Sequence, residues 1–336
     1  MPARDGSIRY VTNSELQTFK ACKRKWWLAY WRKLTPRKED VTGVRGLGTR
    51  LHLALAERYS IGGTELSALE MLRDSFAADL DMLLEQQRLE EHAELLKDKE
   101  LGMIMLEGYF EWVAEEGVDI GLDIYAVEAE VSAPLGLVDV LSGAPIELLG
   151  RLDTRARREI DGAKMFLDHK SVGSFSQATN TLHMDEQMLM YHLLEILDAM
   201  KDGTPFEQVD RCDGGIYNML RRVKRTSRAK PPFYHREEVH HNLHELRSFY
   251  YRVMNTIADI MHLEQELAHT PPEDQHKVAY PRPSRDCTWS CDYFAVCPLF
   301  DDGSHAEGLL NSAFVEYDPL SRYIDMENGL DEGETA

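Results

Sequence analysis

Two aspartates and a lysine lie in stretches of sequence that otherwise predict buried β-strands. Asp153 belongs to "IELLGRLDTRAR", and Asp168 and Lys170 belong to "KMFLDHKSV". Charged groups on apolar strands are costly unless they are paired or used. The three residues therefore indicate either a salt-bridge cluster or exposed sheet edge, or a site where carboxylates hold Mg²⁺ or Mn²⁺. In such a site the lysine would orient or deprotonate a water and neutralise charge developing on phosphorus.

The turn between these two segments decides whether the three side chains can meet. Asp161-Gly162 is a strong signal for a two-residue hairpin loop, which would place Asp153 opposite Lys170. Because side chains alternate along a strand, Asp153, Asp168 and Lys170 are then predicted to share one face of the sheet. Diagonal neighbours lie about 7–8 Å apart, so both carboxylates could reach one ion.

Three further residues could belong to the same site. Gln187 and Tyr191 are four positions apart in "DEQMLMYHLLEILDAM", which predicts a helix, so they share a face. They would contact a phosphate or fix Lys170, or they are ordinary surface residues of the helix. His52 lies in "GTRLHLAL", near the start of a helix predicted from about Thr49. It is either a capping or core residue or a metal ligand.

Cysteines form a second set with possible chemistry. Cys287, Cys291 and Cys297 lie within eleven positions of one another. No signal-peptide-like stretch and no run of about 18 apolar residues occurs, so we expect a cytoplasmic, reducing compartment where such cysteines are ligands. Zinc or an iron–sulfur cube would need a fourth thiolate. Cys22 is the best candidate, because Cys212 is isolated at the start of a predicted strand.

Charge is distributed unevenly along the chain. The formal net charge of −20 argues against a protein that binds nucleic acid through a large positive charge spread over its whole surface. Basic residues nevertheless concentrate in a basic-aromatic stretch over residues 20–38 and in "RRVKRTSRAK" over residues 221–230. Each stretch is either a solvated surface or a contact for a polyanion, with aromatic rings stacking on unpaired bases. The candidate DNA-binding residues are Lys23, Arg24, Lys25, Trp26, Arg221, Arg222, Lys224 and Arg225.

The predicted elements follow the order helices, three strands, helix, strand, helix, which is typical of an α/β fold. Ser14 and Gln17 predict the start of one helix over "LQTFKACKRKWWLAYWRKL", and Gly43, Gly46 and Gly48 predict a loop after it. We expect one body followed by an acidic tail. The body covers residues 1–300, with a helical part over about 13–118, a core over about 122–270 and a cysteine region over 281–300, and the tail covers 301–336.

"GRLD", "LDHKS" and "QMLMY" together resemble the motifs of the PD-(D/E)xK nuclease superfamily in its RecB-like branch, and "GTRLH" resembles the histidine motif of that branch. The resemblance implies a restriction-endonuclease-like α-β-β-β-α-β core, here with an N-terminal helical insertion. It implies Mg²⁺ or Mn²⁺ ligands at His52, Asp153, Asp168 and the backbone carbonyl of His169. It implies a catalytic set of Asp153, Asp168, Lys170, Gln187 and Tyr191.

The cysteine layout resembles that of AddB-type nucleases and of CRISPR-associated RecB-like exonucleases. In these relatives one cysteine before the core and three after it bind a 4Fe-4S cluster. The resemblance implies such a cluster on Cys22, Cys287, Cys291 and Cys297, in a C-terminal loop. The last three are spaced C-x3-C-x5-C here, whereas C-x2-C-x5-C is usual in the family.

The resemblance implies a metal-dependent DNA exonuclease that hydrolyses phosphodiester bonds at single-stranded ends, in recombination, repair or DNA processing. We expect DNA and a protein partner to bind it, and no membrane. Two alternatives stay open. One is a CRISPR-adaptation-type nuclease that trims DNA for integration. The other is a DNA-end-binding iron–sulfur protein without catalysis, against which the complete set of Asp153, Asp168 and Lys170 argues.

Overall fold

The computed structural model describes residues 7–37, 40–205, 208–209 and 212–323. The chain divides into two compact units, each assembled from separate stretches. The first unit comprises Met1–Glu39, Ser132–Gly150 and Arg247–Ala336, and the second comprises Asp40–Val131 and Arg151–Leu246. Strands β3 (Leu122–Val138) and β4 (Pro145–Arg158) run from one unit into the other. Within the described ranges, no helix has the length and apolarity needed to cross a membrane.

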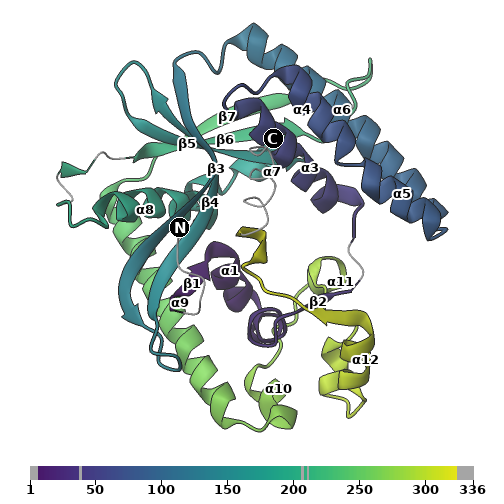
Figure 1. Ribbon diagram of the computed structural model, residues 1–336, viewed down its shortest axis with the longest axis vertical. Helices are drawn as coiled ribbons and strands as arrows, with labels where there is room; N and C mark the ends of the chain where they lie inside the picture. The colour runs from purple at the N-terminus through teal and green to yellow at the C-terminus, as the bar shows by residue number, and fades with distance from the viewer. Residues whose placement is uncertain (1–6, 38–39, 206–207, 210–211, 324–336) are drawn as a thin grey trace, which may run out of the picture. The chain divides into compact units, whose positions relative to one another are not determined.

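The second unit is a mixed β-sheet flanked by helices (Figure 1). Its strands are the first part of β3, the second part of β4, β5 (Lys164–Val172), β6 (Cys212–Arg221) and β7 (Tyr234–Val239). Its helices are α3 (Gly43–Tyr59), α4 (Glu65–Asp74), α5 (Ala77–Glu85), α6 (Leu89–Glu116), α7 (Phe175–Thr179) and α8 (Glu186–Met200), with a 3₁₀ turn at Leu182–Met184. The order β3, β4, β5, α8, β6 confirms the predicted α/β class and the strand, strand, strand, helix, strand succession.

Strand β5 is paired on both sides, antiparallel with β4 and parallel with β6. The two-residue loop predicted after β4 is wrong. It would pair Arg155 with Asp168, but Arg155 pairs with Phe166, because the connection has five residues and Gly162 adopts φ +72° in it. The register therefore differs from the prediction by two residues. Since side chains alternate with a period of two, this difference leaves every side chain on its predicted face.

The two faces of β5 meet different helices. On one face, Phe166 packs edge-on against Tyr191 of α8, with ring centroids 5.7 Å apart. On the other face, His169 stacks on Tyr59 of α3 at 5.5 Å. Helix α8 begins where Asp185 caps it, accepting hydrogen bonds from two backbone amides of the first turn. Helices α3 to α6 and the adjoining strands share a core that includes Leu51, Leu55, Leu72, Phe76, Leu106, Tyr109, Leu220 and Tyr234.

Helix α3 begins earlier than predicted. The sequence predicts a loop over Gly43, Gly46 and Gly48 and a helix from about Thr49, but the helix starts at Gly43. Only glycine fits at position 46, because the helix approaches Val41 closely there. A Cβ at this position would lie 2.4 Å from the Val41 carbonyl oxygen. A glycine that predicts a loop locally therefore serves here for close packing.

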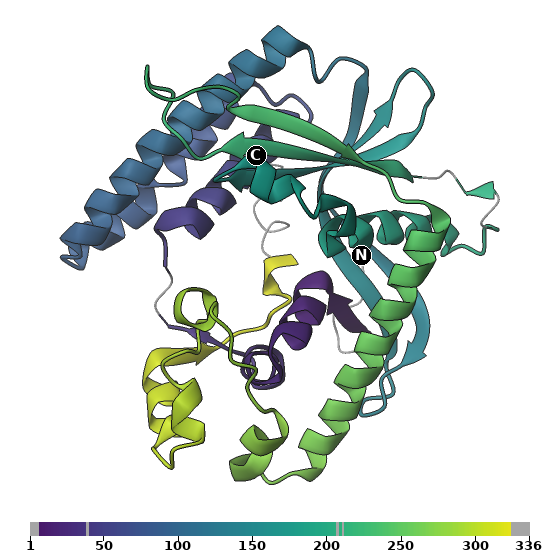
Figure 2. The same cartoon turned by 180° about the vertical axis from the view of Figure 1, so that it is seen from behind.

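The first unit is built on the other parts of β3 and β4. Its N-terminal elements are β1 (Arg9–Thr12), α1 (Asn13–Ala21), α2 (Lys23–Trp26), a π-helix (Trp27–Trp31) and β2 (Leu34–Pro36). Its C-terminal elements are most of α9 (Leu243–His269), α10 (Gln275–Val278), α11 (Cys287–Ser290), α12 (Ala306–Ala313) and β8 (Phe314–Glu316), with 3₁₀ turns at Pro272–Asp274, Cys297–Phe300 and Ser321–Tyr323. Strand β1 pairs in parallel with β4 and β2 pairs antiparallel with β8, while α9 leads towards α10 (Figure 2). The segment predicted as an acidic tail therefore contains α12 and β8, and residues 324–336 lie outside the described ranges.

The single helix predicted near the N-terminus is interrupted. It begins after Thr12, whose hydroxyl accepts a hydrogen bond from the Glu15 amide at 3.2 Å, rather than at Ser14. Helix α1 ends at Ala21, because Cys22 adopts an extended conformation with φ −162° and ψ 116°. Apolar periodicity continues through this position, so the sequence does not indicate the break.

Several side chains of the basic-aromatic stretch are buried. Arg24 and Trp26 are each 1% exposed. The Arg24 guanidinium donates to both carboxylate oxygens of Asp301 and to backbone carbonyls, at 2.7–3.3 Å. The indole N–H of Trp26 donates to Glu15. The prediction that Arg24 and Trp26 contact DNA is therefore wrong, because neither side chain is accessible to a ligand. Lys23 and Lys25 are partly exposed.

Candidate active site

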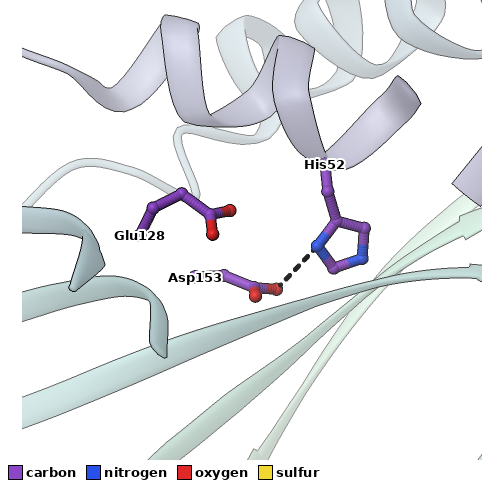
Figure 3. Close-up of side chains that lie close together, drawn as sticks. All are labelled: His52, Glu128 and Asp153. Atoms are coloured by element: carbon purple, nitrogen blue, oxygen red, sulfur yellow. Dashed lines mark ion pairs between the residues drawn. The ribbon is translucent and has the colours of Figure 1, made fainter. Parts of the chain in front are cut away.

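Three side chains in the second unit converge from three different elements. His52 on α3, Glu128 on β3 and Asp153 on β4 point towards one another (Figure 3). One ligand atom from each lies within 4.8 Å of the others, and His52 Nδ1 is 3.2 Å from Asp153 Oδ2. Within the described residues this is the only group of three or more histidine, cysteine or carboxylate side chains that close together.

The position of Asp153 follows from the sheet. The pairing of β4 with β5 runs from Arg157 opposite Lys164 to Thr154 opposite Leu167. At the next position the Asp153 side chain itself bonds to the backbone of β5: its Oδ2 accepts a hydrogen bond from the His169 amide at 2.8 Å. The carboxylate is thus anchored on β5 while it faces His52.

Asp168 is held separately, by the remaining predicted residues. Its Oδ1 accepts from Lys170 Nζ at 2.9 Å and from Gln187 Nε2 at 3.2 Å. Gln187 Nε2 also donates to the Tyr191 hydroxyl at 2.8 Å. The other oxygen, Oδ2, is buried, lies 2.8 Å from Lys170 Nζ without hydrogen-bonding geometry, and accepts no hydrogen bond from the residues that the structure describes. The predicted residues Asp168, Lys170, Gln187 and Tyr191 therefore form one connected group.

Opposite charges keep Asp153 ionised. Burial raises the pKa of this carboxyl, but the adjacent His52 imidazole, together with Lys170, more than offsets burial and holds the pKa well below its usual range. The same contact acts on the partner: burial lowers the pKa of His52, and the attraction of Asp153 raises it above the ordinary value. The two residues form an ion pair whenever the imidazole is protonated.

Burial has more effect on Asp168. It raises the pKa of that carboxyl to about 6, although the charge of Lys170 acts in the opposite direction. Burial lowers the pKa of Lys170, but Asp168 and Asp153 raise it above its usual range. At neutral pH the pair is therefore a carboxylate and an ammonium group, and Lys170 is a hydrogen-bond donor and a fixed positive charge.

Glu128 is the member of the site that the sequence analysis missed. Burial and the charge of Asp153 raise its pKa to about 7. Its backbone has φ +46°, a left-handed conformation that is unusual for glutamate within a strand and is frequent at functional sites. The available signal was the alternation of Glu128 and Glu130 with apolar residues in a strand next to the one that carries Asp153.

The donor set suits a divalent cation. Two carboxylates within 4.8 Å of each other repel, which contributes to the raised pKa of Glu128, and a cation between them would remove that repulsion. The buried Oδ2 of Asp168 is a further oxygen that has no hydrogen-bond donor in the described part of the chain. Oxygen-rich sites with one imidazole are typical of Mn²⁺ and Mg²⁺ rather than of thiophilic metals.

The basic loop after β6 is only partly available to a ligand. Lys224 and Arg225 form ion pairs with Glu100 and Glu111 of α6, each at 2.6 Å. Arg221 donates to a backbone carbonyl. Arg222 hydrogen-bonds the carbonyl and the hydroxyl of Ser171, the residue after Lys170, and burial lowers its pKa. Among the described residues no carboxylate pairs with Arg222.

The four predicted cluster cysteines all lie in the first unit, and none forms a disulfide. Backbone amides of one short segment contact two of them: the Arg282 amide lies 3.4 Å from Cys22 Sγ and the Ser284 amide 3.3 Å from Cys287 Sγ. Burial raises the pKa of Cys291 and of Cys297, and in both cases the Cys22 thiol also raises it. No three of the described sulfur atoms lie within 4.8 Å of one another.

The family model described as the PD-(D/E)XK nuclease superfamily matches residues 10–298, which span both units. A search of curated protein sequences finds no match.

Proposed function

The chain belongs to the PD-(D/E)XK nuclease superfamily, and from this premise we propose that it is a metal-dependent deoxyribonuclease acting as an exonuclease on single-stranded DNA ends. The observation that carries the proposal is the convergence of His52, Glu128 and Asp153 beside the group formed by Asp168 and Lys170. Recombination, repair or related DNA processing is the corresponding biological setting.

His52, Glu128 and Asp153 would hold Mg²⁺ or Mn²⁺, with Asp168 and the His169 carbonyl as further oxygen ligands. Such an ion, when bound, lowers the pKa of a water and stabilises negative charge on a phosphate. His52 Nδ1 now pairs with Asp153, so the imidazole and the carboxylate already face the position that an ion would take. The ion pair between them would be exchanged for two ligand bonds.

Lys170 would act mainly through its charge. Its raised pKa keeps the ammonium protonated, which suits stabilisation of a phosphorane-like transition state better than removal of a proton from water. Gln187 holds the Asp168 carboxylate and is in turn linked to Tyr191, so this pair would fix the orientation of Asp168 and Lys170. Precise orientation of such groups is a large part of catalytic rate enhancement.

Arg222 would contact a phosphate next to the scissile one. It is placed by Ser171, one residue beyond Lys170, and among the described residues its charge is not neutralised by a carboxylate. Lys224 and Arg225 are already paired with glutamates of α6, so they would contribute less. For a DNA strand, an unpaired guanidinium is the better phosphate ligand.

Arg222→Ala is expected to raise KM for a single-stranded oligonucleotide roughly 5- to 10-fold, and to lower the slope of log KM against log salt concentration by about 0.7, the value for one lost phosphate contact. The matched control is Lys224→Ala, whose charge is already paired and whose KM should stay within about twofold of wild type. Steady-state kinetics at several salt concentrations measure both. Equal effects of the two substitutions on KM would show that Arg222 does not contact the DNA more strongly than Lys224 does.

Cys22, Cys287, Cys291 and Cys297 would hold a 4Fe-4S cluster. Zinc–sulfur bonds of about 2.3 Å in a tetrahedron require sulfur atoms about 3.8 Å apart, whereas a cube binds each thiolate at a different iron and needs a wider set. No three of the described sulfur atoms lie within 4.8 Å of one another, which does not favour tetrahedral zinc, and the two amides near sulfur atoms could donate hydrogen bonds to cluster thiolates. The cluster would be structural, linking the N-terminal helices to the C-terminal loop.

The direct test is digestion of end-labelled single- and double-stranded oligonucleotides with Mn²⁺ or Mg²⁺. Stepwise shortening of the single strand, faster than of the duplex and absent with EDTA, is the expected result. Labels at the 5′ and 3′ ends distinguish the direction of cleavage, and a circular single strand should resist. Cleavage of the circle would show endonuclease rather than exonuclease activity. Binding without cleavage under all conditions would contradict the proposed activity.

A further inference from the structure

The His169 side chain lies inside a network of buried polar groups behind the candidate site. We infer that its imidazole is a positioning residue: hydrogen bonds that originate at Arg236 fix the ring in one tautomer, and the ring fixes the stretch of β5 whose amide anchors Asp153. This inference rests on the proposed metal-dependent function, because it concerns residues that arrange the metal-binding carboxylate. His169 itself would touch neither the substrate nor the reacting atoms with its side chain.

The ring is enclosed on all sides. It is 2% exposed and stacks on Tyr59 with centroids 5.5 Å apart and planes 7° from parallel. It lies at 78° to the plane of the His52 ring, with the two ring centroids 6.3 Å apart. Nδ1 lies 2.8 Å from Asn218 Nδ2, and Nε2 lies 3.3 Å from Thr154 Oγ1. Both ring nitrogens therefore have one polar neighbour each, which leaves the placement of the proton to those neighbours.

Arg236 determines how the Asn218 amide is oriented. Its Nε donates to Asn218 Oδ1 at 3.0 Å, and a guanidinium can only donate. The amide oxygen must therefore face Arg236, and the amide nitrogen must face His169 Nδ1. Because Nδ2 is a donor, Nδ1 of His169 must accept. The single proton of the neutral ring is consequently on Nε2, which donates to the Thr154 hydroxyl.

The other hydrogen bonds around Arg236 are consistent with this assignment of donors and acceptors. Its Nη2 shares two hydrogens among three acceptors, the hydroxyls of Tyr109 and Tyr59 and the Asp119 carboxylate, at 2.7–3.0 Å. Tyr109 also receives a hydrogen bond from Asn218 Nδ2 at 3.1 Å, so its own proton is directed to the Tyr59 hydroxyl, 2.8 Å away. Tyr59 in turn donates to the Asp119 carboxylate. Each hydroxyl proton thus has one acceptor, and the network has one consistent arrangement of donors.

The two ends of this network meet the site at adjacent points. Thr154 follows Asp153 directly on β4, and the His169 amide donates to Asp153 Oδ2 at 2.8 Å. A rotated or differently protonated ring would shift one of these contacts, because the ring fills a closed space between Tyr59 and His52. An apolar side chain could fill that space but could not accept from Asn218. The use of histidine is explained by orientation of Asp153 rather than by packing alone.

The first test is the tautomer itself. Nitrogen-15 NMR of the imidazoles in the metal-free wild-type protein should show His169 protonated at Nε2 and unprotonated at Nδ1, assigned by comparison with His169→Gln. In Asn218→Asp, which keeps the acceptor for Arg236 but places an acceptor against Nδ1, a proton should appear on Nδ1. A wild-type ring protonated at Nδ1, or no change in Asn218→Asp, would overturn the inference.

The second test is metal affinity. Asn218→Asp and Thr154→Val should each weaken Mn²⁺ binding roughly 10- to 100-fold, the usual effect of losing a partner that orients a ligand. Tyr59→Phe is the matched control: it removes a hydroxyl of the same network but keeps the ring that stacks on His169, so Mn²⁺ affinity should stay within about threefold of wild type. Glu128→Gln gives the loss expected for a direct ligand.

Calorimetric titration with Mn²⁺ alone measures these affinities without DNA. Wild-type affinity in both Asn218→Asp and Thr154→Val, or an equal loss in Tyr59→Phe, would contradict a positioning role for His169. These outcomes are distinct from failure of the proposed nuclease activity, which would appear as absent DNA cleavage by a wild-type protein that binds Mn²⁺ normally. The NMR result for the wild-type protein stands even if a variant does not fold.

Discussion

Lys170→Ala is expected to lower kcat for DNA cleavage by about 10²- to 10³-fold, with KM for the oligonucleotide changed little. Lys170 Nζ lies 2.8–2.9 Å from both oxygens of Asp168, and its raised pKa keeps it cationic. Alanine removes the charge that would stabilise the transition state. In the metal-free protein Asp168 would also lose its nearest cation, so its pKa, which burial already raises to about 6, would rise further.

Lys164→Ala is the control for this experiment. Lys164 is on the same strand, six residues before Lys170, and therefore about 20 Å away. Its substitution should leave kcat within about twofold of wild type. Asp168→Asn should reproduce the loss seen in Lys170→Ala, while binding of a labelled single strand is retained in both. Undiminished cleavage by Lys170→Ala would show that the catalytic group lies elsewhere.

Cys22→Ser is expected to remove the visible absorbance of an iron–sulfur cluster and to destabilise the folded protein. A link between residues 22 and 287 closes a loop of about 265 residues, and the loss of that constraint corresponds to about 5–6 kcal/mol as an upper estimate. Iron content, the absorption spectrum and thermal unfolding of the purified protein measure the effect. The first unit should lose most of this stability, because all four cysteines belong to it.

Cys212→Ser is the matched control for the cysteine experiment. Cys212 is buried in the second unit, where its thiol lies 3.4 Å from the Gly214 carbonyl oxygen, and burial raises its pKa. Its substitution should leave the absorbance and the iron content unchanged. A colourless wild-type protein with one zinc per chain would contradict the cluster assignment, and equal loss of iron in both variants would contradict the choice of Cys22.

The sequence predicts the strands and the helix that carry Asp168, Lys170 and Gln187 closely, because their apolar periodicity is local. "KMFLDHKSV" is β5 to the residue, and the helix predicted from Asp185 begins at Glu186. The hairpin register was wrong by two residues, since a five-residue connection replaces the tight turn. That error did not affect the predicted site, because only an odd shift would move Asp168 and Lys170 to the other face.

Features that depend on distant segments were not predictable. The left-handed backbone at Glu128 arises within a strand whose pattern looks regular, so nothing local distinguishes Glu128 from Glu130. Arg24 and Trp26 were assigned to DNA from composition, yet Arg24 is covered by residues more than 250 positions later. Composition indicates which side chains could meet a polyanion. It does not indicate which of them the rest of the chain covers.

The contacts of Arg24 also bear on the order in which the chain can fold during synthesis. All segments of the second unit have been made once the ribosome passes Leu246, so the nuclease residues can reach their positions at that stage. Arg24 receives its last partner only when Asp301 emerges, and a cluster that includes Cys22 would have to wait for Cys287, Cys291 and Cys297. The N-terminal helices are thus made before the second unit and completed after it, and under the proposed assignment iron would be loaded onto a chain whose second unit can already have formed.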